Sequence, residues 1–303
     1  MRIKAFFEAM FFQPKWYHYG VMVVLFPLSM LYGSMMFMRR MFAQKKHFSL
    51  PIVSVGNLQV GGSGKTPFVI AVASRYEGVC IVSRGYGRQS QGLVEVSYKG
   101  KILVTVQESG DEPMLMAKSL PNASVIVCEE RSLGIELAMR QGAKMVLLDD
   151  GFNRVNIEKF EILLEPACQP NTLPFPAGAM REFAWTKRYA SLVLKEQKEF
   201  KRVVGYENLT SAMLLVTAIA NPQRLQAYLP KGVVGHFYLE DHAYFNEAQL
   251  KEKMHACGAT ALLVTQKDLV KMEDFTLPLA VMTLTLEIDE EVFQHIDAYC
   301  QSI

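Results

Sequence analysis

Apolar positions are distributed unevenly along the chain, and the longest run of them lies near its start. Residues 20–38 read GVMVVLFPLSMLYGSMMFM and carry no charge. As a helix this stretch would be about 28 Å long, close to the hydrocarbon thickness of a bilayer. Trp16, Tyr17 and Tyr19 precede it and basic residues follow it between positions 39 and 46, which is typical of the interfacial ends of a membrane helix. The pattern predicts a helix that either spans a membrane or lies at its surface.

Two other interpretations of residues 20–38 make different predictions. A cleaved signal peptide is disfavoured, because the apolar run starts late and no A-x-A-like site follows it. A buried helix of a soluble domain stays open as an alternative. Pro27 and Gly33 are compatible with a kink or with partial insertion. Basic residues flank the run on both sides, so their distribution does not indicate an orientation.

Beyond residue 50 the pattern changes to short apolar runs that alternate with amphipathic stretches. Strands are predicted at 52–55, 79–83, 125–128 and 145–148, and helices at 66–76, 112–119 and 131–141. This alternation is typical of a parallel sheet covered by helices on both faces. Residues 93–106 alternate around Lys99 and Gly100, which predicts an inserted hairpin.

The composition excludes several classes of protein. The chain has 303 residues, 50% of them hydrophobic and 20% charged, so disorder and small disulfide scaffolds are excluded. Its 32 basic and 30 acidic residues create no overall field for nucleic acid, and we expect no nucleic-acid partner. The five cysteines are scattered without a C-x-x-C pair, which favours reduced thiols in the cytosol.

A glycine-rich segment lies between the first predicted strand and the helix that follows it. Residues 61–66 read GGSGKT, and a strand, a glycine-rich loop and a helix in this order form a P-loop. Backbone N–H groups of such a loop wrap a phosphate, the lysine reaches the β/γ-phosphates, and the threonine hydroxyl ligates Mg²⁺. Gln59 stands where the strict motif has its first glycine. The predicted ATP-binding residues are Gly61, Gly62, Ser63, Gly64, Lys65 and Thr66.

A second element agrees with the P-loop. Residues 144–150 read KMVLLDD, an apolar strand that ends in two carboxylates, as a Walker B strand does. Asp149 or Asp150 would hold Mg²⁺ directly or through water. Alone, paired acids at a strand end could equally cap the next turn.

The charged residues 195–202 (KEQKEFKR) indicate a hinge, and the apolar segment that starts at residue 213 opens a second α/β unit with strands near 261–265 and 280–286. The predicted fold is α/β: a P-loop NTPase-like parallel-sheet domain with an N-terminal membrane helix and a second, smaller α/β domain. The expected divisions are a membrane-anchoring segment (1–45), a P-loop domain (46–195) and a C-terminal α/β domain (196–303).

With these motifs the chain resembles the tetraacyldisaccharide 4'-kinases of lipid A biosynthesis. Eight blocks occur in the family's order: PLSMLYGSMMFMRRMF from Pro27, SVGNLQVGGSGKTP from Ser54, SRGYGR from Ser83, GDEPMLMA from Gly110, LLDDGF from Leu147, PAGAMRE from Pro176, EDHAY from Glu240 and TQKDLVK from Thr265. The resemblance implies ATP- and Mg²⁺-dependent phosphorylation of the 4'-hydroxyl of a tetraacyldisaccharide 1-phosphate, giving lipid IVA. It also implies a Gram-negative bacterium and the cytoplasmic face of its inner membrane.

The resemblance also implies roles for individual residues. Lys65 serves the nucleotide in catalysis, Asp111 is the base at the acceptor hydroxyl, and His242 is its charge partner, since pairing tunes both groups. The implied metal ligands are Thr66, Asp149, Asp150 and Glu182. Contacts to the sugar or its phosphate are implied for Arg84, Tyr86, Arg88 and Arg131.

Simpler roles compete with some of these assignments. Asp111 could be a helix N-cap, because a helical pattern follows it. A lone histidine such as His242 is more often a solvated or core residue than a catalyst. Arg84 and Arg88 could be ordinary surface residues, although the glycines beside them favour a shaped loop. No chemical role is assigned to Lys267 and Asp268.

The chain departs from the family pattern at two places. Asn153 and Arg154 replace the family's Gln-His after D-D-G-F, which puts a substrate contact there in doubt. Gln266 replaces the Glu of T-E-K-D.

The leading alternative function is a membrane-associated P-loop ATPase switch of the partitioning type, but Val60 replaces that family's early lysine. A kinase of a soluble metabolite would have no use for a membrane segment. Protein partners stay open.

Overall fold

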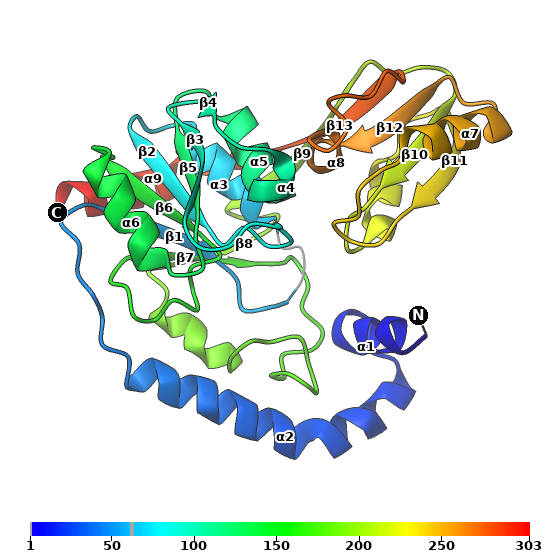
Figure 1. Ribbon diagram of the computed structural model, residues 1–303. Coiled ribbons are helices and arrows are strands. Elements are labelled where there is room, and N and C mark those ends of the chain that lie inside the picture. The colour runs from blue at the N-terminus through cyan, green and yellow to red at the C-terminus, as the bar shows by residue number, and fades with distance from the viewer. Residues whose placement is uncertain (1, 61–63) are drawn as a thin grey trace. The chain divides into compact units, whose positions relative to one another are not determined.

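The structure is a computed structural model that describes residues 2–60 and 64–303 (Figure 1). The chain forms two compact units, each built from separate segments. The first unit comprises residues 1–65, 144–201 and 288–303, and the second comprises 66–143 and 202–287. The domain divisions expected from the sequence are contiguous, and they stay a prediction.

The first unit contains four parallel strands. Its strands are β1 (Ile52–Gly56), β6 (Met145–Asp149), β7 (Phe160–Glu165) and β8 (Leu192–Lys195), in the order β6-β1-β7-β8. Val53 lies opposite Leu147 on β6 and Phe160 on β7. Every residue of β1 and β6 is buried, as expected for parallel strands covered on both faces. The other elements of this unit are α1 (Arg2–Phe12), α2 (Trp16–Met41), the 3₁₀ helix η1 (Ala184–Tyr189) and α9 (Glu290–Gln301).

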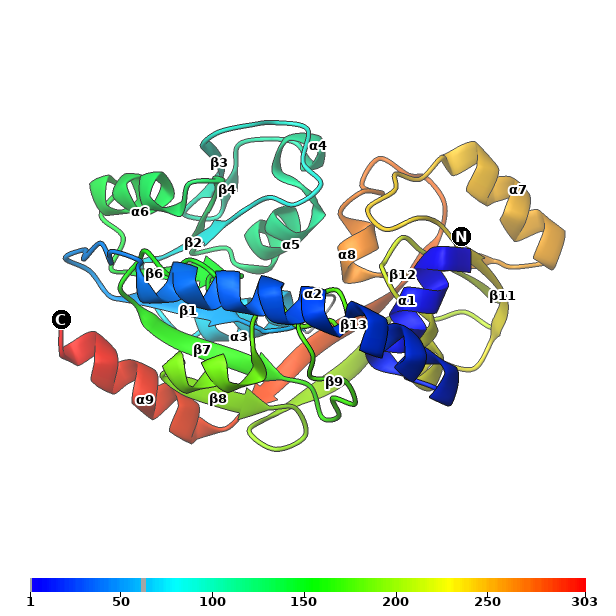
Figure 2. The same cartoon turned by 90° about the horizontal axis from the view of Figure 1, so that it is seen from below.

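The apolar N-terminal stretch forms the long helix α2, which contacts the first unit along one stripe (Figures 1 and 2). The buried residues of α2 are His18, Met22, Ser29 and Gly33. The Ser29 hydroxyl accepts a hydrogen bond of 2.8 Å from the Ala177 backbone N–H. A Cβ atom at Gly33 would lie 2.7 Å from the Phe183 ring, so glycine permits the close approach. The preceding helix α1 was not predicted from the sequence.

The second unit contains the remaining strands in two groups. The first group has β2 (Val79–Ser83), β3 (Val94–Tyr98), β4 (Lys101–Ile102) and β5 (Ser124–Val127), in the order β4-β3-β5-β2. Its helices are α3 (Lys65–Ala73), α4 (Val106–Ser109), α5 (Asp111–Ser119) and α6 (Arg131–Arg140). The predicted hairpin at 93–106 is present but shorter, because β4 has two residues and the chain then turns into α4.

The second group forms a five-stranded sheet in the order β11-β10-β12-β13-β9. Its strands are β9 (Phe200–Glu207), β10 (Met213–Thr217), β11 (Val233–Tyr238), β12 (Ala261–Thr265) and β13 (Leu279–Ile288), and its helices are η2 (Pro222–Tyr228), α7 (Glu247–Cys257) and α8 (Gln266–Leu269). Strands β10 to β13 pair in parallel. The predicted α/β fold with a parallel sheet and an apolar N-terminal helix is therefore confirmed. The five cysteines are free thiols.

Candidate functional site

The predicted phosphate loop connects the end of β1 to the start of α3. Gly61, Gly62 and Ser63 lie outside the described residues. Gly64 has a φ of 79°, a left-handed conformation that glycine adopts without steric cost. Lys65 begins α3, and its Nζ donates a hydrogen bond of 3.0 Å to Asn57 Oδ1 at the end of β1. The lysine is thus held at the carboxyl end of β1.

The loop after β6 brings Asp150 to the same lysine. Lys65 Nζ lies 3.5 Å from Asp150 Oδ1, and Arg181 donates to both carboxylate oxygens at 2.9 and 2.8 Å. Partial burial alone would raise the pKa of Asp150, but the charges of Lys65 and Arg181 outweigh it, and this pKa lies below its ordinary value. Asp150 is therefore an ionised carboxylate clamped between two permanent cations.

Tight packing fixes the course of this loop. A Cβ atom at Gly56 would lie 2.6 Å from Phe152 Cβ, so the loop can cross β1 only where β1 has glycine. Arg40 at the end of α2 donates to the Phe152 carbonyl at 3.2 Å, and its guanidinium lies 4.4 Å from the centre of the Phe152 ring. The end of α2 thus holds the segment that follows Asp150.

The predicted metal ligand Glu182 makes a different contact. Both of its carboxylate oxygens accept hydrogen bonds of 2.9 Å from Arg40, in the bidentate geometry that Arg favours. Among residues 2–60 and 64–303, no three His, Cys, Asp or Glu side chains are grouped as a metal site would require. Glu182 thus anchors α2, and its role as a metal ligand stays a prediction. Asp149, the last residue of β6, is buried, and Thr66 is half-buried in α3.

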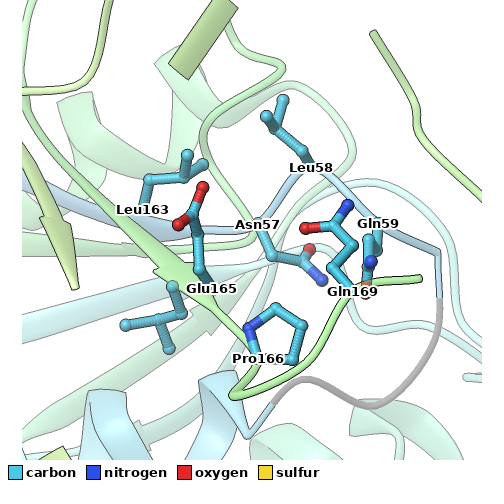
Figure 3. A pocket seen from close by; sticks show the side chains of 8 residues that line it. Asn57, Leu58, Gln59, Leu163, Glu165, Pro166 and Gln169 are labelled. Carbon is cyan, nitrogen blue, oxygen red and sulfur yellow. The ribbon is translucent and has the colours of Figure 1, made fainter. Parts of the chain in front are cut away.

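A small cavity lies beside the start of the phosphate loop (Figure 3). It is lined by Asn57, Leu58, Gln59, Leu163, Leu164, Glu165, Pro166 and Gln169. Its volume of about 10 Å³ holds about one water molecule. This cavity is therefore too small for a nucleotide base.

The predicted pair Asp111 and His242 is formed within the second unit. His242 Nδ1 lies 2.9 Å from both carboxylate oxygens of Asp111, although the two residues are 131 positions apart. Asp111 is the first residue of α5, whose N-cap is Gly110. The alternative role of Asp111 as the N-cap is therefore wrong, because Gly110 occupies that position.

Two lysines from the TQKDLVK block also face Asp111. Lys267 Nζ lies 3.7 Å and Lys271 Nζ lies 3.6 Å from Asp111 Oδ2. Burial alone would raise the pKa of Asp111, but the His242 hydrogen bond and the charges of these lysines and of His242 outweigh it, so this pKa is lowered. Sequence reasoning missed both lysines. The available signal was the four-residue spacing of the two lysines within the TQKDLVK block.

Asp268 supports the loop that carries His242. Its carboxylate accepts hydrogen bonds from the Thr217 hydroxyl at 2.6 Å and from the Ala218 backbone N–H at 3.1 Å. The Ala218 carbonyl in turn accepts the His242 backbone N–H at 3.0 Å. Asp268 is fully buried, so its role is to fix the carboxyl end of β10 and the turn to His242.

The four predicted substrate contacts divide into two pairs. Tyr86 is 66% exposed, and its ring centre lies 5.1 Å from that of His242. Arg84 is also exposed. The side chain of Arg88 is 3% exposed and pairs with Glu129, while buried Arg131 donates to the Cys128 carbonyl. Arg88 and Arg131 therefore bind the protein itself, and the structure gives them no exposed guanidinium for a substrate.

Several known proteins are similar to this chain over most of its length. The family model described as Tetraacyldisaccharide-1-P 4'-kinase (LpxK) matches residues 21–301. The tetraacyldisaccharide 4'-kinase of Helicobacter acinonychis (strain Sheeba) is 50% identical over 298 residues, which cover 98% of this chain and 95% of the relative. The corresponding kinase of Aliarcobacter butzleri (strain RM4018) is 41% identical over 310 residues, covering 99% and 98%.

A solved structure is similar over most of the chain. A crystal structure of the "apo" form of LpxK from Aquifex aeolicus in complex with ATP has a TM-score of 0.78 and 28% identity, and the match covers 92% of this chain and 99% of that chain. The family model and these relatives cover nearly the whole chain. The chain belongs to the tetraacyldisaccharide-1-phosphate 4'-kinase family.

Proposed function

We propose that this chain transfers the γ-phosphate of ATP to the 4'-hydroxyl of a tetraacyldisaccharide 1-phosphate, forming lipid IVA in lipid A biosynthesis. The observation that carries the proposal is the Asp111–His242 pair, with 2.9 Å between the imidazole and both carboxylate oxygens. Transfer to a hydroxyl needs a base at the acceptor, whereas a nucleotide-driven binding switch does not.

The geometry supports a different division of roles from the one that the resemblance implies. A carboxylate can only accept hydrogen bonds, so the ionised Asp111 fixes the proton of His242 on Nδ1. Nε2 is then the nitrogen that can accept a proton, and the side chain of His242 is 18% exposed whereas that of Asp111 is 3% exposed. His242 is therefore the base at the 4'-hydroxyl, and Asp111 orients it. Asp241 Oδ2, 3.5 Å from Nε2, stabilises the imidazolium that forms.

The phosphates of ATP are bound by the other cluster. Lys65 supplies the cation at the β/γ-phosphates, as the lysine of a P-loop does. Because Asn57 and Asp150 hold the lysine in place before the nucleotide arrives, little reorganisation is needed when the phosphate charge develops.

Oxygen donors for Mg²⁺ are available beside this lysine. Asp149 and Asp150 at the end of β6, together with the Thr66 hydroxyl, are the oxygen ligands that Mg²⁺ prefers, and the lowered pKa of Asp150 keeps its carboxylate ionised. When bound, the ion would neutralise charge on the β- and γ-phosphate oxygens. Glu182 is the fourth proposed ligand: its oxygens accept hydrogen bonds from Arg40, and a carboxylate has further lone pairs for a metal.

The lipid acceptor is bound beside His242. Arg84 and Tyr86 are exposed on the SRGYGR loop, and the Tyr86 ring lies against the imidazole. A guanidinium suits the phosphate of the acceptor, and a tyrosine ring suits its sugar. Arg84 therefore binds the substrate phosphate, and Tyr86 positions the sugar at the base.

The enzyme acts at the cytoplasmic face of the inner membrane, through α2. Among the described residues, α2 is the one helix with the length and apolar composition to cross a bilayer. Its inner stripe packs against Ala177 and Phe183, while Val23, Val24 and Leu31 are exposed on its outer side. A helix that packs on its own protein along one stripe and exposes apolar side chains on the other lies in the membrane surface rather than across it.

A transfer assay tests the proposed function. Labelled γ-phosphate from ATP should move to a tetraacyldisaccharide 1-phosphate in detergent micelles, and the Lys65→Ala variant should abolish this transfer. Lys253→Ala, an exposed lysine on α7, is the matched control and should leave the transfer rate unchanged. Hydrolysis of ATP without labelling of the lipid would instead support the ATPase-switch function.

A further inference from the structure

Lys271 occupies a central place behind the Asp111–His242 pair. Its side chain is 1% exposed. Its Nζ donates a hydrogen bond of 3.1 Å to the Ala243 carbonyl, next to His242 in the chain, and lies 3.6 Å from both Asp111 Oδ2 and Asp268 Oδ1. One buried cation thus joins the start of α5, the loop that carries His242, and the end of β10 through Asp268.

The loop that Lys271 holds has an unfavourable backbone conformation. His242 has a φ of 63°, a left-handed conformation that costs a non-glycine residue about 1 kcal/mol or more. Such a conformation persists only when surrounding contacts fix it. The His242 backbone N–H donates a hydrogen bond to the Ala218 carbonyl. The carbonyl of the next residue, Ala243, accepts a hydrogen bond from Lys271. Lys271 is therefore one of the contacts that keep the imidazole directed at Asp111.

Lys267 provides a natural comparison. Its Nζ is at nearly the same distance from Asp111 Oδ2, 3.7 Å, and its side chain is 20% exposed. Its hydrogen bond of 3.0 Å goes to Glu112, which lies on the same helix as Asp111. Both lysines thus place a positive charge beside Asp111, but Lys271 also bonds to the loop that carries His242.

We propose that Lys271 is a positioning residue of the phosphoryl-transfer site, which holds the His242 loop against Asp111 and balances the charge of the pair. The inference rests on the proposed function, in which His242 Nε2 accepts the proton. It predicts two separable effects of Lys271, one on the charge felt by the imidazole and one on its placement.

The charge effect depends on all the ionisable groups that face the pair. These groups are Asp111 and Glu112 from α5, Tyr86 from the SRGYGR loop, Asp241 and Tyr244 from the EDHAY loop, and Lys267, Asp268 and Lys271 from the TQKDLVK segment. The four carboxylates in this set already outnumber the two lysines, and removal of one lysine increases the excess of negative charge. The imidazolium form is then favoured, so His242 should titrate at a higher pH.

The first experiment reads this effect without any substrate. The full chain in detergent is labelled with ¹⁵N-histidine, the His242 signals are assigned with His242→Gln, and their titration midpoint is measured. Lys271→Met should raise the midpoint by about one pH unit, and Lys267→Met should raise it by less because this lysine is more exposed. Lys253→Met should leave it in place. An unchanged midpoint in Lys271→Met would overturn the charge effect.

The second experiment separates placement from charge by steady-state kinetics. Lys271→Met should lower kcat about 10²-fold, because a displaced base is poorly aligned, with the KM for ATP unchanged. Lys271→Arg keeps the charge, so it should keep the midpoint and recover part of kcat. Lys267→Met should lower kcat less than tenfold. Equal losses of kcat in Lys271→Met and Lys267→Met would overturn the placement effect.

Two controls keep the inference testable. If Lys271→Met does not fold, as judged by its near-UV circular dichroism, Lys271→Arg decides. If Lys271→Arg keeps the titration midpoint of His242 but has a reduced kcat, the placement role is supported. If this variant has the wild-type kcat, the placement role is overturned. The titration needs no lipid, so a wild-type chain that fails to phosphorylate the lipid contradicts the proposed function and leaves the Lys271 shift measurable by itself.

Discussion

Two carboxylates, Asp150 in the first unit and Asp111 in the second, are each surrounded by cations, but the cations differ in kind. Asp150 is paired with Lys65 and Arg181, and lysine and arginine are the residue types that carry a positive charge at neutral pH. Asp111 is paired with an imidazole as well as with Lys267 and Lys271. Permanent charges suit phosphate binding, whereas an imidazole can gain and lose a proton near neutrality. In the proposed function, the cluster around Asp150 binds phosphate and the cluster around Asp111 transfers the proton.

The largest effect on the rate is expected from a substitution in the cluster around Asp150, which binds phosphate in the proposed function. Lys65→Ala should lower the rate of lipid phosphorylation by about 10³-fold, because a preorganised cation at the β/γ-phosphates is lost. It should also weaken ATP binding, measured by calorimetry. A variant that binds ATP as the wild type does would break the assignment of the cluster around Asp150 to the nucleotide.

Truncation of Asp111 in the other cluster should affect turnover and ATP binding differently from truncation of Lys65. Asp111→Ala should lower kcat by about 10²-fold, within the range of general acid–base catalysis, and should change the affinity for ATP little. Turnover and calorimetric affinity measured on the same preparation test this division. Equal losses in both quantities would contradict it.

The two arginines of the SRGYGR loop are expected to differ in role: one binds the acceptor and the other stabilises the fold. Arg84→Ala should raise the KM for the lipid about tenfold, because an exposed guanidinium that binds a phosphate is lost. Arg88→Ala should instead lower the melting temperature, because it removes the partner of Glu129 and a hydrogen bond of 2.5 Å to the Gly92 carbonyl. Lipid KM values and melting curves of both variants check this. A reversed pattern would exchange the roles of the two arginines.

The smallest effect is expected in acid. The pKa values of Asp111 and Asp150 are lowered in the folded chain, so these carboxyls stabilise the fold above their unfolded value of about 3.9. That contribution is lost as the pH falls through the folded pKa values. Melting temperatures of Asp111→Asn should therefore fall less steeply than those of the wild type below about pH 4. An identical slope would show that Asp111 makes no such contribution.

The sequence is most informative where the signal is local. The order of strand, GGSGKT and helix located Lys65, and the KMVLLDD run located Asp150, because both signals depend on a few consecutive residues. The short length of β4 could not be predicted, since a turn into α4 replaces the expected alternation. Likewise, nothing near residue 182 in the chain indicates that Arg40, 142 positions away, pairs with Glu182.

Long-range pairing explains the other misses at the site. Asp111 and His242 were linked only through a family resemblance, because no periodicity connects positions 131 apart. Lys271 was missed for the same reason. Arg84 and Arg88 are equally plausible surface residues in the sequence, and they differ only because the turn at Gly85 and Gly87, both with positive φ, directs Arg88 inward.

The most direct test of the central claim is a pair of measurements on His242→Gln. Calorimetry should give the wild-type affinity for ATP, while transfer of labelled γ-phosphate to the lipid should fall by about 10²- to 10⁴-fold, as loss of a general base predicts. Transfer at the wild-type rate, or loss of ATP binding, would contradict the assignment of proton transfer to the Asp111–His242 pair.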